Sequence, residues 1–168
     1  MDAQDFDALY RGSVGDVHAY ALSLLGERSA AEDVTALAFE RLYRARARLD
    51  RGRGTPRALL FTIARNAAID ELRRRRRQSP VELVEEAEDL DPTTEIEHVE
   101  RRERVRGALV KLSLRDREIV LLKFHGQLSN VELARALGIS ESNAGSRLHR
   151  ALERLRSACL ELDREEVA

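Results

Sequence analysis

The chain has 168 residues, of which 35% are charged and only 4% are aromatic, and its formal net charge is −1. This composition favours helices rich in Leu, Ala and Arg over a strand-rich fold, and the length allows one or two small domains. The single cysteine excludes an internal disulfide, and neither the acidic start of the chain nor its short apolar runs predict a signal peptide or a membrane span. We therefore expect a protein of the reducing cytoplasm.

The net charge conceals a division of the chain into three parts. Residues 1–80 carry 15 arginines and 11 acidic residues, and residues 101–168 carry 14 basic and 10 acidic residues. Between them, residues 81–100 carry 9 acidic residues and no Lys or Arg. The two basic blocks suit contact with nucleic acid. Within the acidic stretch, residues 81–93 show no sustained periodicity, which predicts a flexible linker.

The first basic block predicts three or four helices. An apolar stripe begins at Phe6 and is interrupted near Gly12–Gly15 before Gly26 closes it. Ser29 and Glu32 have the spacing of a capping box, which predicts the start of the next helix at this point.

A third helix follows the loop Asp50–Gly54. Thr55 is a typical capping residue, and Pro56 stands at the first helical position, where its missing N–H costs nothing. The helix ends in five adjacent arginines, Arg73–Arg77. These side chains can form a solvated helix end, but after a helix that exposes Arg65 and Asn66 we favour a phosphate-binding patch.

The second basic block predicts four helices, of which the last two form a helix-turn-helix pattern. Ser129 and Glu132 make a capping box, Gly138 suits a left-handed helix end, and Ser140 caps the following helix. Apolar residues repeat at helical spacing on one face of that last helix. The opposite face carries the side chains that a helix needs in the major groove of DNA: Ser142, Asn143, Ser146, Arg147 and Arg150. A plain helical hairpin within a small bundle is the alternative.

No catalytic or metal-binding pattern is present. The histidines are scattered, there is no second cysteine, and Gly-rich phosphate loops are absent. We therefore expect no enzyme activity, no metal and no cofactor.

Taken together, these segments resemble the bacterial RNA polymerase sigma factors of the extracytoplasmic-function (ECF) subgroup of the sigma-70 family. The resemblance extends from about Phe6 to Leu162 and depends on three segments: Ala31–Arg44, Leu59–Arg74, and Leu114–Val120 with the helix-turn-helix behind it. It implies an all-α fold of two small helical domains. Sigma region 2 would span residues 1–78 and sigma region 4 residues 94–165, with the acidic linker at 79–93.

The resemblance also implies a function and a set of partners. The protein would bind core RNA polymerase through its clamp and flap regions and direct initiation at promoters, without membrane insertion. An anti-sigma factor that clamps the two domains together would control it.

The resemblance assigns each predicted contact to particular residues of this chain. Polymerase contacts are expected from Asp33, Glu40, Arg41 and Arg44. Contacts to the −10 strand are expected from Arg53, Arg65, Asn66, Arg73 and Arg74, with the loop 50–54 receiving an extruded base. In the −35 element, Asn143 and Arg147 would read base edges, whereas Ser142, Ser146 and Arg150 would contact phosphates.

Three positions depart from the family pattern. Ala36 stands where Gln is usual, Leu59 where Trp is usual, and Ala144-Gly145 where Val-Lys is usual. Gly145 removes a cation and a side chain from the DNA face, so we expect a weaker −35 contact, and Ala36 points to weaker polymerase binding. Two rival functions therefore stay open: a DNA-binding regulator that never joins polymerase, and a sigma-like protein that binds a partner without starting transcription.

Overall fold

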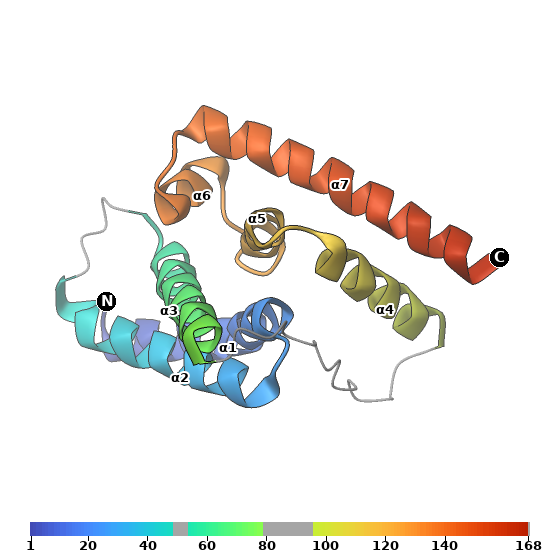
Figure 1. The fold of residues 1–168 in the computed structure, drawn as a ribbon. Coiled ribbons are helices and arrows are strands. Elements are labelled where there is room, and N and C mark those ends of the chain that lie inside the picture. Colours follow the sequence, from blue (N-terminus) through green and yellow to red (C-terminus); the bar gives the residue numbers. More distant parts are fainter. Residues whose placement is uncertain (49–53, 79–95, 168) are drawn as a thin grey trace.

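The computed structural model describes residues 1–48, 54–78 and 96–167. Over these ranges the chain forms seven α-helices and one short 3-10 helix, η1 (Arg46–Arg48), with no strand (Figure 1). The prediction of an all-α fold is therefore confirmed. The predicted linker at 79–93 lies outside the described residues.

The first domain is a bundle of three helices. They are α1 (Ala3–Leu25), α2 (Arg28–Ala45) and α3 (Pro56–Gln78), and each packs against the other two. Its interior is apolar and includes the fully buried side chains of Leu42 and Leu60. Burial of such side chains stabilises the bundle by about 1.5–3 kcal/mol each.

Two details of this domain differ from the prediction. Helix α1 runs through Gly12 and Gly15 without a break, because the residues on either side bury one continuous face against α2 and α3. The capping box at Ser29 is also wrong. Helix α2 begins at Arg28, the Ser29 hydroxyl donates to a Glu27 carboxylate oxygen at 2.5 Å, and Glu32 pairs with Arg28 one turn away.

The start of α3 follows the prediction. Pro56 is the first residue of the helix, and the Thr55 hydroxyl accepts a hydrogen bond from the Ala58 N–H at 3.1 Å. The second domain contains α4 (Ile96–Lys111), α5 (Leu114–Phe124), α6 (Asn130–Leu137) and α7 (Glu141–Val167).

The helix-turn-helix signals of the second domain are confirmed. Ser129 and Glu132 form both hydrogen bonds of a capping box at the start of α6. Gly138 ends α6 with a φ of 65°, a left-handed conformation that glycine adopts without strain. The Ser140 hydroxyl then accepts from the Asn143 N–H at 3.1 Å and caps α7.

The two domains share one hydrophobic core. Tyr20 and Phe61 of the first domain belong to the same cluster of buried side chains as Leu122, Leu128 and Leu133 of the second. Helix α1 packs against α5, and α3 packs against α6. Figure 1 shows α5 and α6 lying between α3 and the long α7, which forms the outer edge of the molecule. The sequence predicted two tethered domains but not this contact between them.

Candidate DNA and polymerase interfaces

The outer face of α7 carries most of the predicted −35 residues. Four of the five side chains are exposed: Ser142, Asn143, Ser146 and Arg150. The opposite side of the helix is buried through Ala144, Leu148 and Ala151 against α5 and α6. This apolar anchor holds the polar face outward, as a helix that enters the major groove requires.

Arg147 behaves differently from its neighbours on α7. Its Nη2 donates to the backbone oxygen of Arg115 at 2.7 Å and lies 3.6 Å from Glu118 Oε2, and only 18% of the side chain is exposed. The guanidinium therefore joins α7 to α5. Its predicted role at a base edge stays a prediction, and it requires that these contacts break.

Gly145 has room for a side chain. A Cβ at this position would lie 3.7 Å from Asn130 Nδ2, an ordinary van der Waals distance. Packing therefore does not require glycine here. The fold would accept a larger residue, so the consequence of the glycine is that the DNA face lacks a side chain at this position.

The predicted −10 residues on α3 fall into two groups. Asn66, Arg73 and Arg74 are exposed, whereas Arg65 is half-buried. The Arg65 Nε donates to Glu118 Oε1 of the second domain, and its Nη1 donates to Asn66 Oδ1 at 3.1 Å. Arg53 lies outside the described residues.

The run Arg73–Arg77 is not one uniform patch. Arg75 turns inward, where it bonds Glu71 at 2.9 Å, the Leu25 carbonyl at 3.1 Å and Glu27 at 2.7 Å. This arginine ties α3 to the α1–α2 turn. The other four side chains of the run are exposed. Arg75 therefore has a structural role and is not part of the predicted phosphate-binding patch.

Glu71 organises the neighbouring part of the same surface. Hydrogen bonds from Arg74, and then from Arg75, lower the pKa of Glu71 to about 2. The same carboxylate raises the pKa of Arg74. Glu71 therefore stays ionised at any physiological pH and fixes the guanidinium of Arg74 on the α3 surface.

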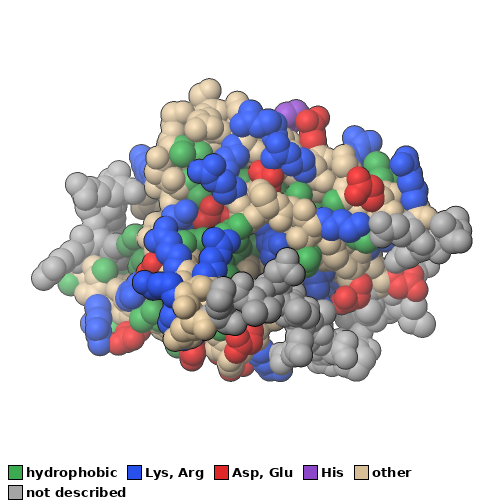
Figure 2. All heavy atoms as spheres, in the orientation of Figure 1, with side chains coloured by type: hydrophobic (Ala, Val, Ile, Leu, Met, Phe, Trp, Pro, Cys, Tyr) green, Lys and Arg blue, Asp and Glu red, His purple; other side chains and the backbone are tan. Residues whose placement is uncertain are grey.

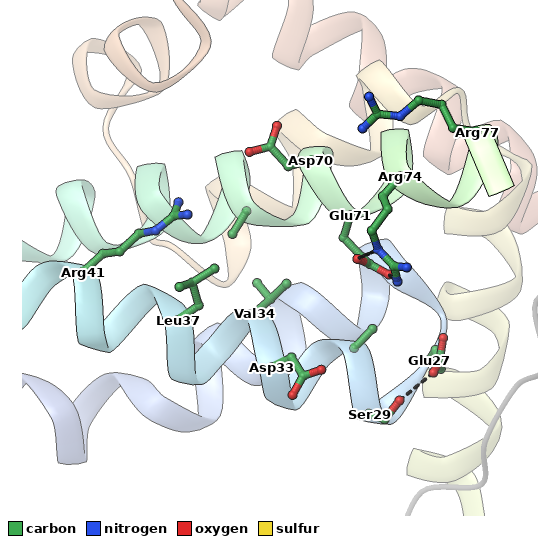
Figure 3. Close-up of a pocket in the computed structure, with 12 residues that line it drawn as sticks. Glu27, Ser29, Asp33, Val34, Leu37, Arg41, Asp70, Glu71, Arg74 and Arg77 are labelled. Atoms are coloured by element: carbon green, nitrogen blue, oxygen red, sulfur yellow. Dashed lines mark hydrogen bonds and ion pairs between the residues drawn. The ribbon is translucent and has the colours of Figure 1, made fainter.

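The predicted polymerase residues line the exposed side of α2. Asp33, Glu40, Arg41 and Arg44 are all exposed, and Glu40 pairs with Arg44 at 2.6 Å. Asp33 and Arg41 also line a groove of about 450 Å³ between α2 and α3. In Figure 3 the side chains of Asp70, Arg74 and Arg77 line it from the α3 side, and Val34 and Leu37 contribute apolar surface from α2.

Basic side chains dominate one view of the whole molecule. Figure 2, drawn in the orientation of Figure 1, shows blue Lys and Arg side chains gathered over α7 and over α3, with fewer red acidic ones between them. Such a distribution attracts the phosphate backbone of nucleic acid. The near-neutral total charge therefore does not describe this face.

Sequence reasoning missed two residues that the structure makes prominent. Arg57, at the first turn of α3, bonds both domains, and Glu118 is buried between Arg65 and Arg147. No local pattern indicates either role, because the partners lie far away in sequence.

Two kinds of feature are absent from the part of the chain that the structure describes. No helix there is long and apolar enough to cross a membrane. In the same ranges, no group of three or more His, Cys, Asp or Glu side chains is placed to hold a metal ion.

Comparison with known families assigns both domains. Residues 9–78 match the family described as Sigma-70 region 2, and residues 102–155 match Sigma-70, region 4. The ECF RNA polymerase sigma factor SigL of Mycobacterium tuberculosis is 32% identical over 157 residues, which cover 92% of this chain and 89% of that protein. SigM of Bacillus subtilis is 29% identical over 153 residues, which cover 90% of this chain and 93% of SigM.

Solved structures show the same arrangement of helices. The sigma factor RpoE in complex with the anti-sigma factor NepR from Bartonella quintana has a TM-score of 0.78 at 25% identity, covering 96% of this chain and 99% of RpoE. CnrH in complex with the cytosolic domain of CnrY has a TM-score of 0.68 at 25% identity, covering 96% of this chain and 91% of CnrH. With both sigma regions present in order, the chain belongs to the ECF sigma factors of the sigma-70 family.

Proposed function

We propose that this chain binds core RNA polymerase in the cytoplasm and directs initiation at promoters with a −10 and a −35 element. The polymerase performs the chemistry of RNA synthesis, and this chain supplies promoter specificity without catalysing a reaction itself. Its region 2 spans residues 1–78 and its region 4 spans residues 94–165. The end of α3 at Gln78 supports the first of these boundaries.

The observation that carries the proposal is the outward polar face of α7. An exposed amide, two hydroxyls and a guanidinium stand on the first turns of a helix whose other side is anchored by α5 and α6. Asn143 can offer its amide to a base edge, and Arg150, Ser142 and Ser146 can contact phosphates. The Arg147 guanidinium can also contact a base edge once its contacts with Arg115 and Glu118 break.

Helix α3 would bind the −10 element. Arg73 and Arg74 supply exposed cations for phosphates, and Asn66 supplies an exposed amide. Arg65 joins them when its bond to Glu118 breaks. The loop 50–54, with Arg53, would receive a base pulled from the stack, a step whose cost of a few kcal/mol needs cations and apolar contacts to offset it.

We assign the groove between α2 and α3 as the binding site for protein partners. Its charged rim and apolar floor suit an amphipathic helix that presents both kinds of side chain. The polymerase clamp and an anti-sigma factor would compete for this surface. The solved RpoE was captured with the anti-sigma factor NepR, which supports control of this kind.

Transcription in vitro tests the function directly. Purified protein and matching core polymerase are mixed with fragmented genomic DNA, and the 5′ ends of the RNA are sequenced. RNA starts that lie behind a shared two-part motif, and that vanish without the protein, are the expected result. Stable polymerase binding without any starts would instead identify a partner-binding protein, and no polymerase binding would identify an ordinary DNA-binding regulator.

Charge reversal in the groove tests the polymerase site. Arg41→Glu places a carboxylate on the groove rim, whereas the control Arg28→Glu makes the same change on an exposed part of α2 outside the groove lining. We expect Arg41→Glu to weaken core polymerase binding by about tenfold, a loss of ~1.4 kcal/mol. Equal binding by both variants would remove the groove from the polymerase interface.

A further inference from the structure

Four aromatic side chains gather where the start of α1 meets the end of α2. They are Phe6 and Tyr10 of α1 and Phe39 and Tyr43 of α2, and we call them the aromatic patch. The chain has only seven aromatic residues, four Phe and three Tyr, so the patch holds more than half of them. Figure 1 shows the start of α1, at the N label, beside the last turns of α2.

The rings of the aromatic patch touch one another edge to face. The distances between ring centroids are 4.8 Å for Tyr10 and Phe39, 6.3 Å for Phe6 and Phe39, and 5.1 Å for Phe6 and Tyr43. Phe39 is buried, whereas Tyr10 is 43% exposed and Tyr43 is 46% exposed. Edge-to-face pairs are favourable arrangements of rings. The patch therefore presents two tyrosine rings to solvent in fixed positions.

An arginine lies on one of these rings. The Arg46 Cζ is 3.5 Å from the centroid of the Tyr43 ring, and its Nη1 donates to the Tyr43 carbonyl at 2.8 Å. Because a guanidinium has five N–H donors, this contact leaves others for a phosphate. Exposed aromatic rings combined with a stacked guanidinium are the kind of surface on which the bases of a single strand stack.

The charge near the patch favours nucleic acid as its occupant. Residues 41–48 hold four arginines and no acidic residue. Two acids close to the patch are already paired, Asp7 with Arg11 at 2.9 Å and Glu40 with Arg44 at 2.6 Å, and the two acids at the start of α1 form its capping box. The side of the patch that belongs to α2 is therefore basic, as contact with a phosphate backbone requires.

The patch also lies next to the place where unpaired DNA is expected. Helix α2 and η1 lead directly into the loop 50–54, which is proposed to receive an extruded base. Extrusion costs the stacking of that base on its neighbours, and exposed rings can offset the loss. Helix α3 offers no such ring, because its one aromatic side chain, Phe61, is fully buried. Tyr10 and Tyr43 are the exposed rings of the first domain.

We propose that the aromatic patch binds unpaired bases of the single strand next to the −10 element. The Tyr10 ring supplies one stacking surface, the Arg46 and Tyr43 pair supplies a second, and Arg46 donates to a neighbouring phosphate. Because stacking holds the bases, the patch accepts any base sequence. The place of this site in initiation rests on the proposed function, but the binding of a single strand by the free chain requires no polymerase.

Strand affinity tests the patch in the free, full-length chain. The probe is a labelled single-stranded DNA of mixed sequence, and its duplex form is the comparison. We expect Tyr10→Leu and Tyr43→Leu each to weaken single-strand binding by about tenfold and to leave duplex binding unchanged, because only unpaired bases stack on the rings. Tyr43→Phe keeps the ring and should bind as the unmodified chain does. The control Phe124→Leu removes an exposed ring outside the patch and should have no effect.

Salt dependence separates the arginine from the rings. Arg46→Gln should reduce the slope of single-strand binding against salt by ~0.7, as the loss of one phosphate contact does. Tyr10→Leu should weaken binding at an unchanged slope, because stacking releases no counterion. The control Arg28→Gln makes the same charge change at the exposed start of α2 and should keep the slope.

Photo-crosslinking tests the site without any substitution. A single strand that carries 5-iodouracil is irradiated with the unmodified chain, and the crosslinked peptides are identified by mass spectrometry. Attachment to Tyr10 or Tyr43 is the expected result. If a leucine variant fails to fold by circular dichroism, this measurement decides.

Three results would overturn the inference: single-strand affinities of both leucine variants equal to that of the unmodified chain, crosslinks confined to other peptides, or weaker polymerase binding by Tyr43→Leu at unchanged strand affinity. The last result would assign the patch to the polymerase interface. Failure of the transcription assay with intact strand binding would contradict the proposed function and leave this site standing.

Discussion

The two DNA surfaces of this protein are built on similar helices and presented in opposite ways. On α7, the polar face points outward because Ala144, Leu148 and Ala151 are buried on the other side. On α3, Arg65 and Phe61 point toward the second domain and are covered by it. Whether a surface can bind DNA therefore depends on which of its side chains the neighbouring elements bury, as well as on the residues that it carries. The predictions below test this difference.

The largest effect is expected from Phe61→Ala. Phe61 is fully buried at the junction of both domains, so its removal leaves a cavity and lowers the free energy of unfolding by about 3–5 kcal/mol. The matched control is Phe124→Ala, because Phe124 is 61% exposed and its loss costs about 0.5 kcal/mol or less. Urea unfolding of both variants measures the difference. Similar losses would show that Phe61 is not at a packed junction.

Two substitutions on α7 separate base reading from phosphate contact. Asn143→Ala should cost about 1–3 kcal/mol on the correct −35 sequence and little on a scrambled one. Arg150→Ala should weaken both sequences about equally and reduce the slope of binding against salt by ~1. Fluorescence anisotropy across a salt series measures both. If instead only Arg150→Ala reduced the preference for the correct −35 sequence, Arg150 would read the base edge and Asn143 would contact phosphate.

A gain of function is expected from Gly145→Lys. The position accepts a side chain at an ordinary contact distance from Asn130, and replacing a glycine inside a helix stabilises it by roughly 0.5–1 kcal/mol. The lysine also adds a cation to the DNA face. Gly145→Ala is the control, since it restores the helix without the charge. Tighter −35 binding by the lysine variant than by the alanine variant is the expected result, and equal binding would assign the whole gain to the helix.

The smallest effect concerns pH and the contact between the two domains. Burial lowers the pKa of His125 below its ordinary 6.5, although Asp16 nearby partly opposes the shift. Because the pKa of His125 is depressed where the domains meet, the stability of the contact between the domains is fully present above pH 6.5. It is lost as the pH falls, because the imidazole takes up a proton once the domains separate.

A donor and an acceptor dye attached at Ala36→Cys on α2 and Arg156→Cys on α7, both exposed positions, in a Cys159→Ser background, report the distance between the domains. Energy transfer between these dyes should therefore decline modestly as the pH is lowered from 7.5 to 5.5. His125→Gln keeps a polar side chain at the position but cannot titrate in this range. An equal decline in that variant would assign the effect to other groups.

Local signals gave most of the fold. The caps at Thr55, Ser129 and Ser140 and the left-handed Gly138 act within one helical turn, so the sequence shows them directly. Such a signal is overridden at two places. Packing keeps α1 continuous through its glycines, and at Ser29 a neighbouring residue replaces the predicted capping box.

The candidate sites were predictable only in part. The exposed face of α7 follows from helical periodicity. Contacts between distant residues do not: Arg57 meets Gly126, and Arg65 meets Glu118, across separations of 69 and 53 positions. The inward turn of Arg75 and the contact of Arg147 with Arg115 likewise depend on partners that no pattern in the sequence identifies.

Footprinting on one promoter fragment tests the contrast between the two surfaces most directly. The fragment is taken from a start site found by transcription in vitro, and permanganate reactivity reports melting of the −10 element. Free protein should protect the −35 element alone, and holoenzyme should protect both elements and make the −10 thymines reactive. Protection of both elements by the free protein, or −10 reactivity without polymerase, would contradict a covered −10 surface.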